Sequence, residues 1–217
     1  MEAKKLLEEA VISLKSVMDN SNEQITQSDI RRVLNDLVAV LYQNTRKESD
    51  KFDYYKFCAK DQSRPVLNGI FHDNGNVVAT NGHILLVVKE EYDPIYEGKS
   101  ISKAGTVIEG RFPNWKAVIP KFENEGKTLD LNRIIEIRDQ MLLDKKIEPN
   151  KKFMMRVNGK SIRLDLLSLC IKFLNKFPKA VFNTKEDNYG AMVFEYEENI
   201  CIVMPYFEDE NSKVYEY

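Results

Sequence analysis

The sequence has little of what export, membrane insertion or metal binding require. No apolar run approaches the ~20 residues that cross a bilayer. Glu8 and Glu9 fall where a signal peptide would be apolar. The three cysteines lie far apart and form no C-x-x-C pair, and with only two histidines the sequence indicates no disulfide framework, metal site or other cofactor. We therefore expect a cytoplasmic protein with buried thiols and no membrane partner.

Enzyme signatures are missing as well. The chain has no glycine-rich phosphate-binding loop, no H-E-x-x-H pattern and no G-x-S-x-G turn. Acids such as Asp61 and Glu109 are not paired in a recognisable acid/base arrangement. We predict that the protein is not an enzyme.

The chain does have the apolar residues for a core and an uneven charge distribution. Its 217 residues are 43% hydrophobic and 10% aromatic, which suits one domain or one and a half. Residues 151–179 carry eight basic residues and one acid, whereas residues 182–217 carry nine acids and two lysines. This asymmetry favours a polyanion on one side of the protein, unless the charges are spread over solvated faces and cancel. The sequence leaves both interpretations open.

Two amphipathic helices are expected at the beginning of the chain. Residues 2–18 and about 28–44 repeat apolar residues at helical spacing. They predict an N-terminal helical hairpin over residues 1–48. A packing or dimerisation arm is the simpler interpretation, but residues 25–32 also have a faint helix-turn-helix character, with Arg31 and Arg32 able to contact phosphates.

Strand-like patterns follow the polar stretch 45–50, which we interpret as a boundary. Asp73, Asn74 and Gly75 predict a tight turn between two strands. Residues 92–102 contain a proline and a glycine and are expected to form a loop. The expected strands in this part are 53–59, 65–72, 77–80, 83–89, 106–109 and 117–119.

The remaining part alternates helices with strands. A helix is expected over 129–143, and a second one, capped by Asp165, over 166–177. Asn158 and Gly159 predict a two-residue hairpin turn. The expected strands are 153–157, 160–164, 179–184, 191–196 and 200–204. The acidic tail after Tyr206 is expected to be loose.

Four motifs carry a family resemblance. They are Arg64-Pro-Val-Leu-Asn-Gly69, Ala79-Thr-Asn-Gly-His83, the run Gly110-Arg-Phe-Pro-Asn-Trp-Lys-Ala-Val-Ile-Pro120, and Cys201-Ile-Val-Met-Pro205. The first three resemble the middle domain of the bacterial DNA sliding clamp, the polymerase III beta subunit. The fourth is similar to the Val-Met-Pro that closes the family's last domain. The resemblance implies an α+β fold over residues 49–217, a DNA-clamp-like domain of antiparallel sheets with helices on one face.

The resemblance also implies a surface pocket for short apolar peptides of replication or repair proteins. Without it, the apolar members of the set would be assigned to the core, and His83 would be a hydrogen-bonded structural histidine. Family clamps have an arginine where this chain has Ile84, which predicts a different peptide preference. The implied pocket residues are Leu67, Thr80, Gly82, His83, Leu85, Pro113, Val118, Ile202 and Met204.

For DNA, the resemblance implies phosphate contacts that do not read bases and that weaken with salt. The candidate residues are Lys60, Arg64, Lys160, Arg163, Lys172, Lys176 and Lys179. Our leading hypothesis is a sliding-clamp-like accessory protein that binds DNA, tethers partners, or both. Because family rings contain six domains, a chain with one such domain would form a homo-oligomer of six copies. The alternatives are a monomeric or dimeric peptide-binding adaptor that does not encircle DNA, and a DNA-binding or assembly role for residues 1–48.

Overall fold

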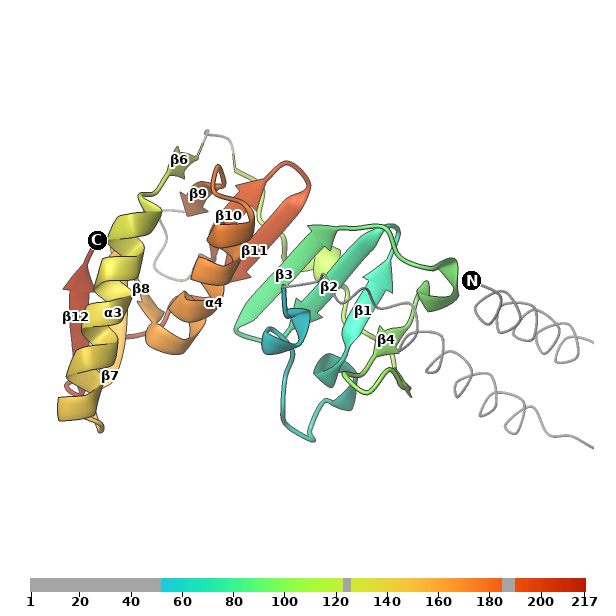
Figure 1. Cartoon of the computed structure of the whole chain (residues 1–217), viewed down its shortest axis with the longest axis horizontal. Helices are drawn as coiled ribbons and strands as arrows, with labels where there is room; N and C mark the ends of the chain where they lie inside the picture. Colours follow the sequence, from blue (N-terminus) through green and yellow to red (C-terminus); the bar gives the residue numbers. More distant parts are fainter. Residues whose placement is uncertain (1–51, 123–125, 185–189) are drawn as a thin grey trace, which may run out of the picture.

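The computed structural model describes residues 52–122, 126–184 and 190–217 (Figure 1). The helical hairpin predicted for residues 1–48 lies outside these residues and stays a prediction. Within the described ranges, no helix is long and apolar enough to cross a membrane. The same ranges contain no group of three or more His, Cys, Asp or Glu side chains that is placed to hold a metal ion.

The first half of the described chain is built on a three-stranded meander. Asn74 and Gly75 join β1 to β2 with positive φ angles of 51° and 73°, which confirms the predicted tight turn. The strands are β1 (Ile70–Asp73), β2 (Asn76–Thr80), β3 (Ile84–Lys89), β4 (Ser100–Ile101) and β5 (Val107–Ile108). Four 3₁₀ turns accompany them: η1 (Tyr54–Lys56), η2 (Pro65–Asn68), η3 (Pro94–Tyr96) and η4 (Trp115–Val118).

Two of the strands expected here are wrong. Residues 53–59 form no strand and contain η1 instead, since Tyr54, Tyr55 and Phe57 are all buried and an alternating strand would expose some of them. Residues 117–119 belong to the η4 segment, where the amide of Ala117 donates to the carbonyl of Asn114 at 3.2 Å. The expected strand 65–72 is a strand only in its second half, since its first half is η2, which begins at a proline.

The second half contains both helices, and here the predictions are largely confirmed. Asn158 and Gly159 make the predicted hairpin turn, with φ angles of 50° and 73°. The helices are α3 (Leu131–Ile147) and α4 (Leu164–Lys176). The strands are β6 (Lys127–Thr128), β7 (Lys152–Val157), β8 (Lys160–Arg163), β9 (Val181–Thr184), β10 (Met192–Tyr196), β11 (Asn199–Val203) and β12 (Ser212–Glu216).

Two further corrections concern this half. Asp165 does not cap α4; the helix follows directly on β8, Arg163 takes the cap position, and Asp165 lies in the first turn, bonded to that arginine at 2.5 Å. An acid there still favours the helix through its dipole. The tail is not loose, because β12 pairs in parallel with β7. The sequence did not predict β12, because its five residues show no clear alternation of apolar and polar side chains.

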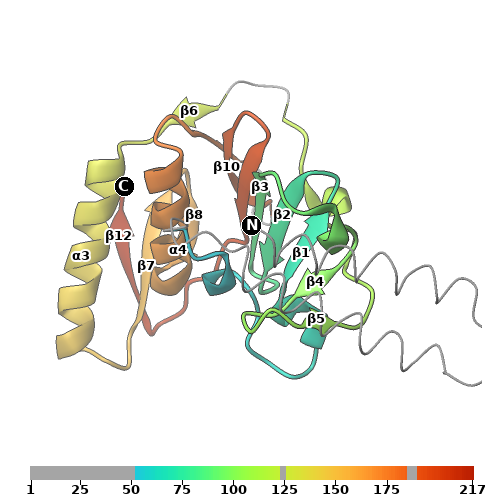
Figure 2. The same ribbon diagram turned by 45° about the vertical axis from the view of Figure 1, so that its right-hand side comes forward.

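Most strands form one sheet of nine, in the order β5-β4-β1-β2-β3-β11-β10-β9-β6. The two halves of the chain meet where β3 pairs antiparallel with β11, from Ile84 opposite Val203 to Val87 opposite Ile200. A second sheet has the order β12-β7-β8. Helices α3 and α4 lie side by side over this small sheet, and α4 also contacts β11 (Figures 1 and 2).

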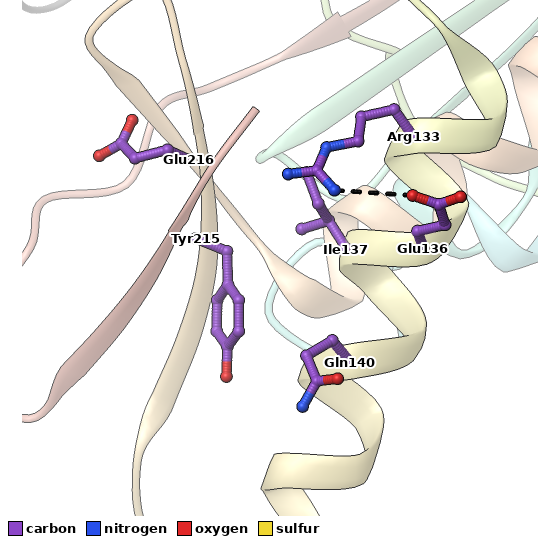
Figure 3. Close-up of a pocket in the computed structure, with 6 residues that line it drawn as sticks. All are labelled: Arg133, Glu136, Ile137, Gln140, Tyr215 and Glu216. Carbon is purple, nitrogen blue, oxygen red and sulfur yellow. Dashed lines mark ion pairs between the residues drawn. The ribbon is translucent and has the colours of Figure 1, made fainter.

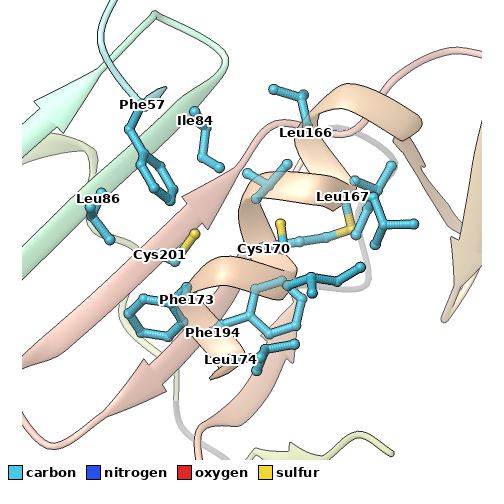
Figure 4. Close-up of a cluster of buried hydrophobic side chains, with 14 of the residues drawn as sticks. Phe57, Ile84, Leu86, Leu166, Leu167, Cys170, Phe173, Leu174, Phe194 and Cys201 are labelled. Atoms are coloured by element: carbon cyan, nitrogen blue, oxygen red, sulfur yellow. The ribbon is translucent and has the colours of Figure 1, made fainter. Parts of the chain in front are cut away.

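Strand β3 is buried on both faces of the large sheet. Ile84, Leu86 and their neighbour Cys201 face the main core, where α4 contributes residues such as Cys170 and Phe173 (Figure 4). The alternate residues of β3 face a second, smaller core on the opposite side of the sheet. All three cysteines are buried, as predicted. The sheet thus separates a helix-covered face from a face that carries the candidate site.

His72 on β1 makes folding depend on pH. Its ring is 4% exposed and packs edge-on against Tyr92, with ring centroids 4.8 Å apart. Burial lowers the pKa of His72 from 6.5 to about 4. As the pH falls from 7, the unfolded chain therefore takes up the proton first, and stability that is complete above pH 6.5 is lost between pH 6.5 and 4.

We expect the free energy of unfolding to fall by roughly 2 kcal/mol between pH 7 and pH 5 through His72 alone. Urea unfolding of the wild type and of His72→Gln at both pH values measures this contribution. The variant should lose less stability than the wild type, whereas His83→Gln, which changes the exposed histidine, should lose as much. Equal losses in all three proteins would contradict the assignment.

Candidate peptide-binding site

All nine residues proposed for the pocket line one hollow of about 210 Å³ on the face of the large sheet away from α4. They come from four segments that are far apart in the sequence. Five further residues complete the lining: Arg64, Ile84, Phe112, Asn114 and Trp115. The structure brings the predicted residues together, and their role in binding a peptide stays a prediction.

The floor of the pocket is apolar and rigid. Leu85 of β3 and Ile202 of β11 lie opposite each other at the point where the two halves of the sheet meet. Both are buried, as is Leu67 of η2. At the rim, Val118 and Met204 are 59% and 43% exposed, which is unusual for such side chains in this otherwise well-buried region. An apolar floor with exposed apolar side chains at the rim favours an apolar ligand.

The turn between β2 and β3 is shaped by its own side chains. The Thr80 hydroxyl donates to the carbonyl of Ile84 at 2.6 Å and accepts from the amide of Gly82 at 3.1 Å. The Asn81 side-chain oxygen accepts from the amides of His83 and Ile84 at 2.9 and 3.0 Å. These bonds hold the tight turn from within, and the carbonyl of His83 also accepts from the amide of Met204 at 2.9 Å. The rim is therefore fixed before a ligand arrives.

Gly82 serves both the turn and the pocket. Its φ of 88° favours glycine, and a Cβ atom there would lie 3.0 Å from an Nη atom of Arg64. The guanidinium of Arg64 thus lies over the turn at the mouth of the pocket. The structure places Arg64, which was also proposed as a DNA contact, among the residues that line the pocket.

The position of Arg64 matters because this chain has Ile84 where family clamps have an arginine. Ile84 lines the pocket, but it is 1% exposed and belongs to the core on the opposite face of the sheet. A cation is nevertheless present at the mouth, because η2 supplies Arg64. Among the lining residues there are one arginine and one histidine and no carboxylate. The mouth therefore favours an anionic group on the ligand.

One wall of the pocket is anchored to β1. The indole N–H of Trp115 and the ammonium of Lys116 both reach Oδ2 of Asp73, each at 2.9 Å. Burial acts to raise the pKa of Asp73, but the bonds from Lys116 and Trp115 outweigh it and hold that pKa below its usual value. Phe112 stacks on Phe71 with ring centroids 4.4 Å apart. The sequence motif 110–120 contains Phe112 and Trp115, but we did not predict that these two residues would form a wall of the pocket.

The other proposed DNA contacts differ in their exposure and in their partners. Lys160 is 6% exposed and donates to the carbonyl of Gly190 at 2.9 Å. Arg163 is held by Asp165 and stacks over Tyr206. Lys176 donates to the Tyr54 hydroxyl at 2.8 Å, while Lys60 and Lys179 are exposed.

Lys172 is the remaining member of the proposed DNA-binding set and lies in a positive environment. Its pKa is lowered by burial and by the neighbouring Lys56, with a smaller contribution from Arg138 of α3. Lys56 and Arg138 were not predicted, because they belong to segments far away in the sequence. The carboxylate of Asp53 acts on the pKa of Lys172 in the opposite direction, and Arg138 is paired with Asp139 at 2.6 Å.

No protein-family model and no curated protein matches the sequence. Solved structures of bacterial sliding clamps do resemble this fold. The DNA polymerase III subunit beta of Borrelia burgdorferi, in complex with a natural product, has a TM-score of 0.52 and 14% identity, over 72% of this chain and 61% of that chain. The sliding clamp of Bartonella birtlesii, bound to griselimycin, has a TM-score of 0.53 and 14% identity, over 71% and 63% of the two chains.

A third structure is the beta sliding clamp of C. crescentus, which has polyethylene glycol bound to its putative beta-motif tethering region. Its TM-score is 0.52 at 14% identity, over 70% of this chain and 61% of that chain. The chain therefore aligns with less than two thirds of the length of these clamps. At such low identity the likeness concerns the fold, which is clamp-like, with mostly antiparallel sheets and two described helices.

The anchor at Asp73 can be tested with Trp115, the only tryptophan of the chain. In Asp73→Ala the indole N–H and Lys116 lose their shared partner, which should destabilise the fold by roughly 1–3 kcal/mol. Trp115 should then become more accessible to acrylamide, measured as an increased quenching constant. Glu91→Ala, which removes an exposed acid from the same half of the chain, should leave quenching unchanged. Unaltered quenching in Asp73→Ala would show that the wall does not depend on this anchor.

Proposed function

We propose that the protein is a non-enzymatic, sliding-clamp-like accessory factor of DNA replication or repair that holds partner proteins through the pocket around Leu85 and Ile202. The observation that carries this proposal is the convergence of four separate motifs on one apolar pocket in a clamp-like fold. The fold alone would not support this function, because one fold can serve many functions. The pocket adds the specific site that the fold alone lacks.

The lining describes the ligand. Apolar floor residues bind one or two apolar side chains through buried area, and Met204 adapts its unbranched side chain to their shape. Arg64 at the mouth favours a peptide with an acidic residue or a terminal carboxylate next to the apolar anchor. A pocket of this size takes a short segment of a partner and leaves the rest of that partner free, as a tether requires.

We expect peptides that contain the clamp-binding segment of replication proteins to bind with micromolar affinity. Met204→Asp should weaken binding at least tenfold, because a carboxylate at the rim would be desolvated beside an apolar ligand, at more than about 1.4 kcal/mol. Fluorescence anisotropy of a labelled peptide measures the affinity, and quenching of Trp115 reports whether the peptide enters the pocket.

Leu143→Asp is the matched control, since Leu143 is an exposed leucine on α3, outside the pocket. It should bind the peptides as the wild type does. If no such peptide binds, or if both variants bind equally well, the tethering function is wrong.

A second part of the proposal is self-association and DNA binding. Helix α3 exposes Leu142, Leu143 and Ile147, of which Ile147 is 78% exposed. Such a face supports contact with another chain. Lys172, together with Lys56 and Arg138, supports contact with phosphates. If the described residues count as one clamp domain, six copies would complete a ring around DNA; an adaptor that stays monomeric or dimeric is the alternative.

Light scattering of the full chain, with and without nicked circular DNA, separates these possibilities. A ring predicts a mass of six times the 25.2 kDa chain, alone or after DNA is added. Lys172→Glu should then reduce DNA binding, and DNA binding should weaken steeply with salt.

Arg64→Ala should leave DNA binding unchanged while it weakens the binding of acidic peptides to the pocket. A monomer or dimer that ignores DNA would leave only the adaptor.

A further inference from the structure

The chain continues for twelve residues after Pro205, where the family motif ends, and these residues cover a sheet edge. Tyr206 pairs with Ser161 beside β8, its amide donating to the Ser161 carbonyl at 2.8 Å. The chain then turns and adds β12 to the outer edge of β7, in parallel, from Ser212 opposite Lys152 to Glu216 opposite Arg156 (Figures 1 and 2). We refer to residues 206–217 as the strap.

The edge beneath the strap is one that a protein needs to cover. Strand β7 is rich in apolar residues, and Phe153, Met154, Met155 and Val157 are buried. The amide of Lys152 donates to the carbonyl of Asn211 in the strap, and the amide of Tyr217 donates to the carbonyl of Arg156, both at 2.9 Å. Without the strap, these groups would form an unpaired, apolar strand edge, which is a template for pairing with another chain.

Charged groups hold most of the strap. Arg156 bonds to Glu216 at 2.5 Å and to Glu208 at 2.9 Å. Lys213 on β12 bonds to Glu148 at 2.6 Å and to Asp144 at 2.9 Å. Lys152 and Asp209 form another ion pair. These contacts join the strap to β7 on one side and to the end of α3 on the other.

Apolar packing under the strap comes from Tyr215, which is partly buried against the main core, with its ring centroid 6.4 Å from that of Phe153. No residue of β12 is fully buried. Between Tyr215 and Glu216 on one side and α3 on the other lies a hollow of about 370 Å³, lined also by Arg133, Glu136, Ile137 and Gln140 (Figure 3). An edge element that is held by a short backbone ladder, partly exposed ion pairs and one partly buried aromatic residue beside a hollow opens at lower free energy than the core.

We propose that the strap is releasable and that its release exposes the edge of β7 as a docking site for the strap of a second copy of this chain. The occupant follows from charge. The site presents Lys152 and Arg156 from β7 and two acids from α3, and the strap brings Asp209, Glu208 and Glu216 to the cations and Lys213 to the acids. A second copy carries the same pattern in the same parallel register.

The chain's own strap occupies the edge in most molecules because it is covalently connected to the sheet that it covers. A segment joined by a short linker has an effective concentration on the order of millimolar, well above micromolar protein. Exchange between copies therefore needs conditions that weaken the ion pairs, such as high salt, or a high local concentration of the protein. The strap would in this way limit self-association, and this inference does not depend on the pocket binding a peptide.

The test uses the full chain with Glu208→Gln and Glu216→Gln combined, which removes both partners of Arg156. Glu210→Gln is the matched control, because Glu210 is exposed in the same strap and its side chain makes no hydrogen bond or ion pair with the residues that the structure describes. Amide hydrogen exchange then compares two sets of amides on β7. By the alternation of a strand, the amides of Met154 and Arg156 face the strap, and those of Met155 and Val157 face β8.

We expect the amides that face the strap to exchange at least tenfold faster in the double variant, with those that face β8 unchanged. The wild type at 1 M salt, where the screening length is about 3 Å, should show the same selective loss. A labelled peptide of residues 206–217 should then bind the double variant at least tenfold more tightly than it binds the Glu210→Gln control.

Three results would overturn the proposal. Unchanged exchange at Met154 and Arg156 would mean that the strap is not releasable. Equal acceleration at all four amides would indicate general destabilisation of the sheet. Selective acceleration without binding of the strap peptide would show that the exposed edge is not a docking site. Binding of the partner peptide to the pocket is measured separately through the fluorescence of Trp115. The proposed function can therefore fail or succeed independently of the strap.

Discussion

The antiparallel pairing of β3 with β11 is the interaction on which the rest of the structure depends. It joins strands that are more than a hundred residues apart and turns two small sheets into one. Because β3 is buried on both faces, one set of its residues supports the helix-covered core and the other set supports the pocket. A shift of one residue in this register would exchange the two sets and abolish both.

The pocket follows from this pairing. Leu85 and Ile202 meet only because their strands are neighbours, and the amide of Met204 donates to the carbonyl of His83 at 2.9 Å, which holds the end of β11 against the β2–β3 turn. The wall that contains Trp115 is then fixed from a third direction by Asp73. Three segments thus hold this apolar surface in place, which is pre-organisation of the kind that favours ligand binding.

The small sheet shows a different solution to the problem of apolar surface. Strand β7 lies between β8 and β12, and the chain's own tail covers it through backbone pairing and ion pairs. The large sheet ends in the two-residue strands β5 and β6, and such short strands offer little backbone for pairing with another chain.

The sequence by itself determined the local structure wherever a short-range signal was strong. It determined the Asn158–Gly159 hairpin, both described helices and the last strands of the large sheet, because turn residues and periodicity act over a few residues. Through the four motifs it also named nine residues that line one pocket. It failed at residues 53–59 and at β12, where consecutive buried aromatic residues and a distant partner strand override local preference. Only the tertiary structure decided that Arg64 lies at the pocket, that Lys160 is buried and that the acidic tail covers β7. These three outcomes depend on contacts between residues far apart in the chain, and no local pattern encodes them.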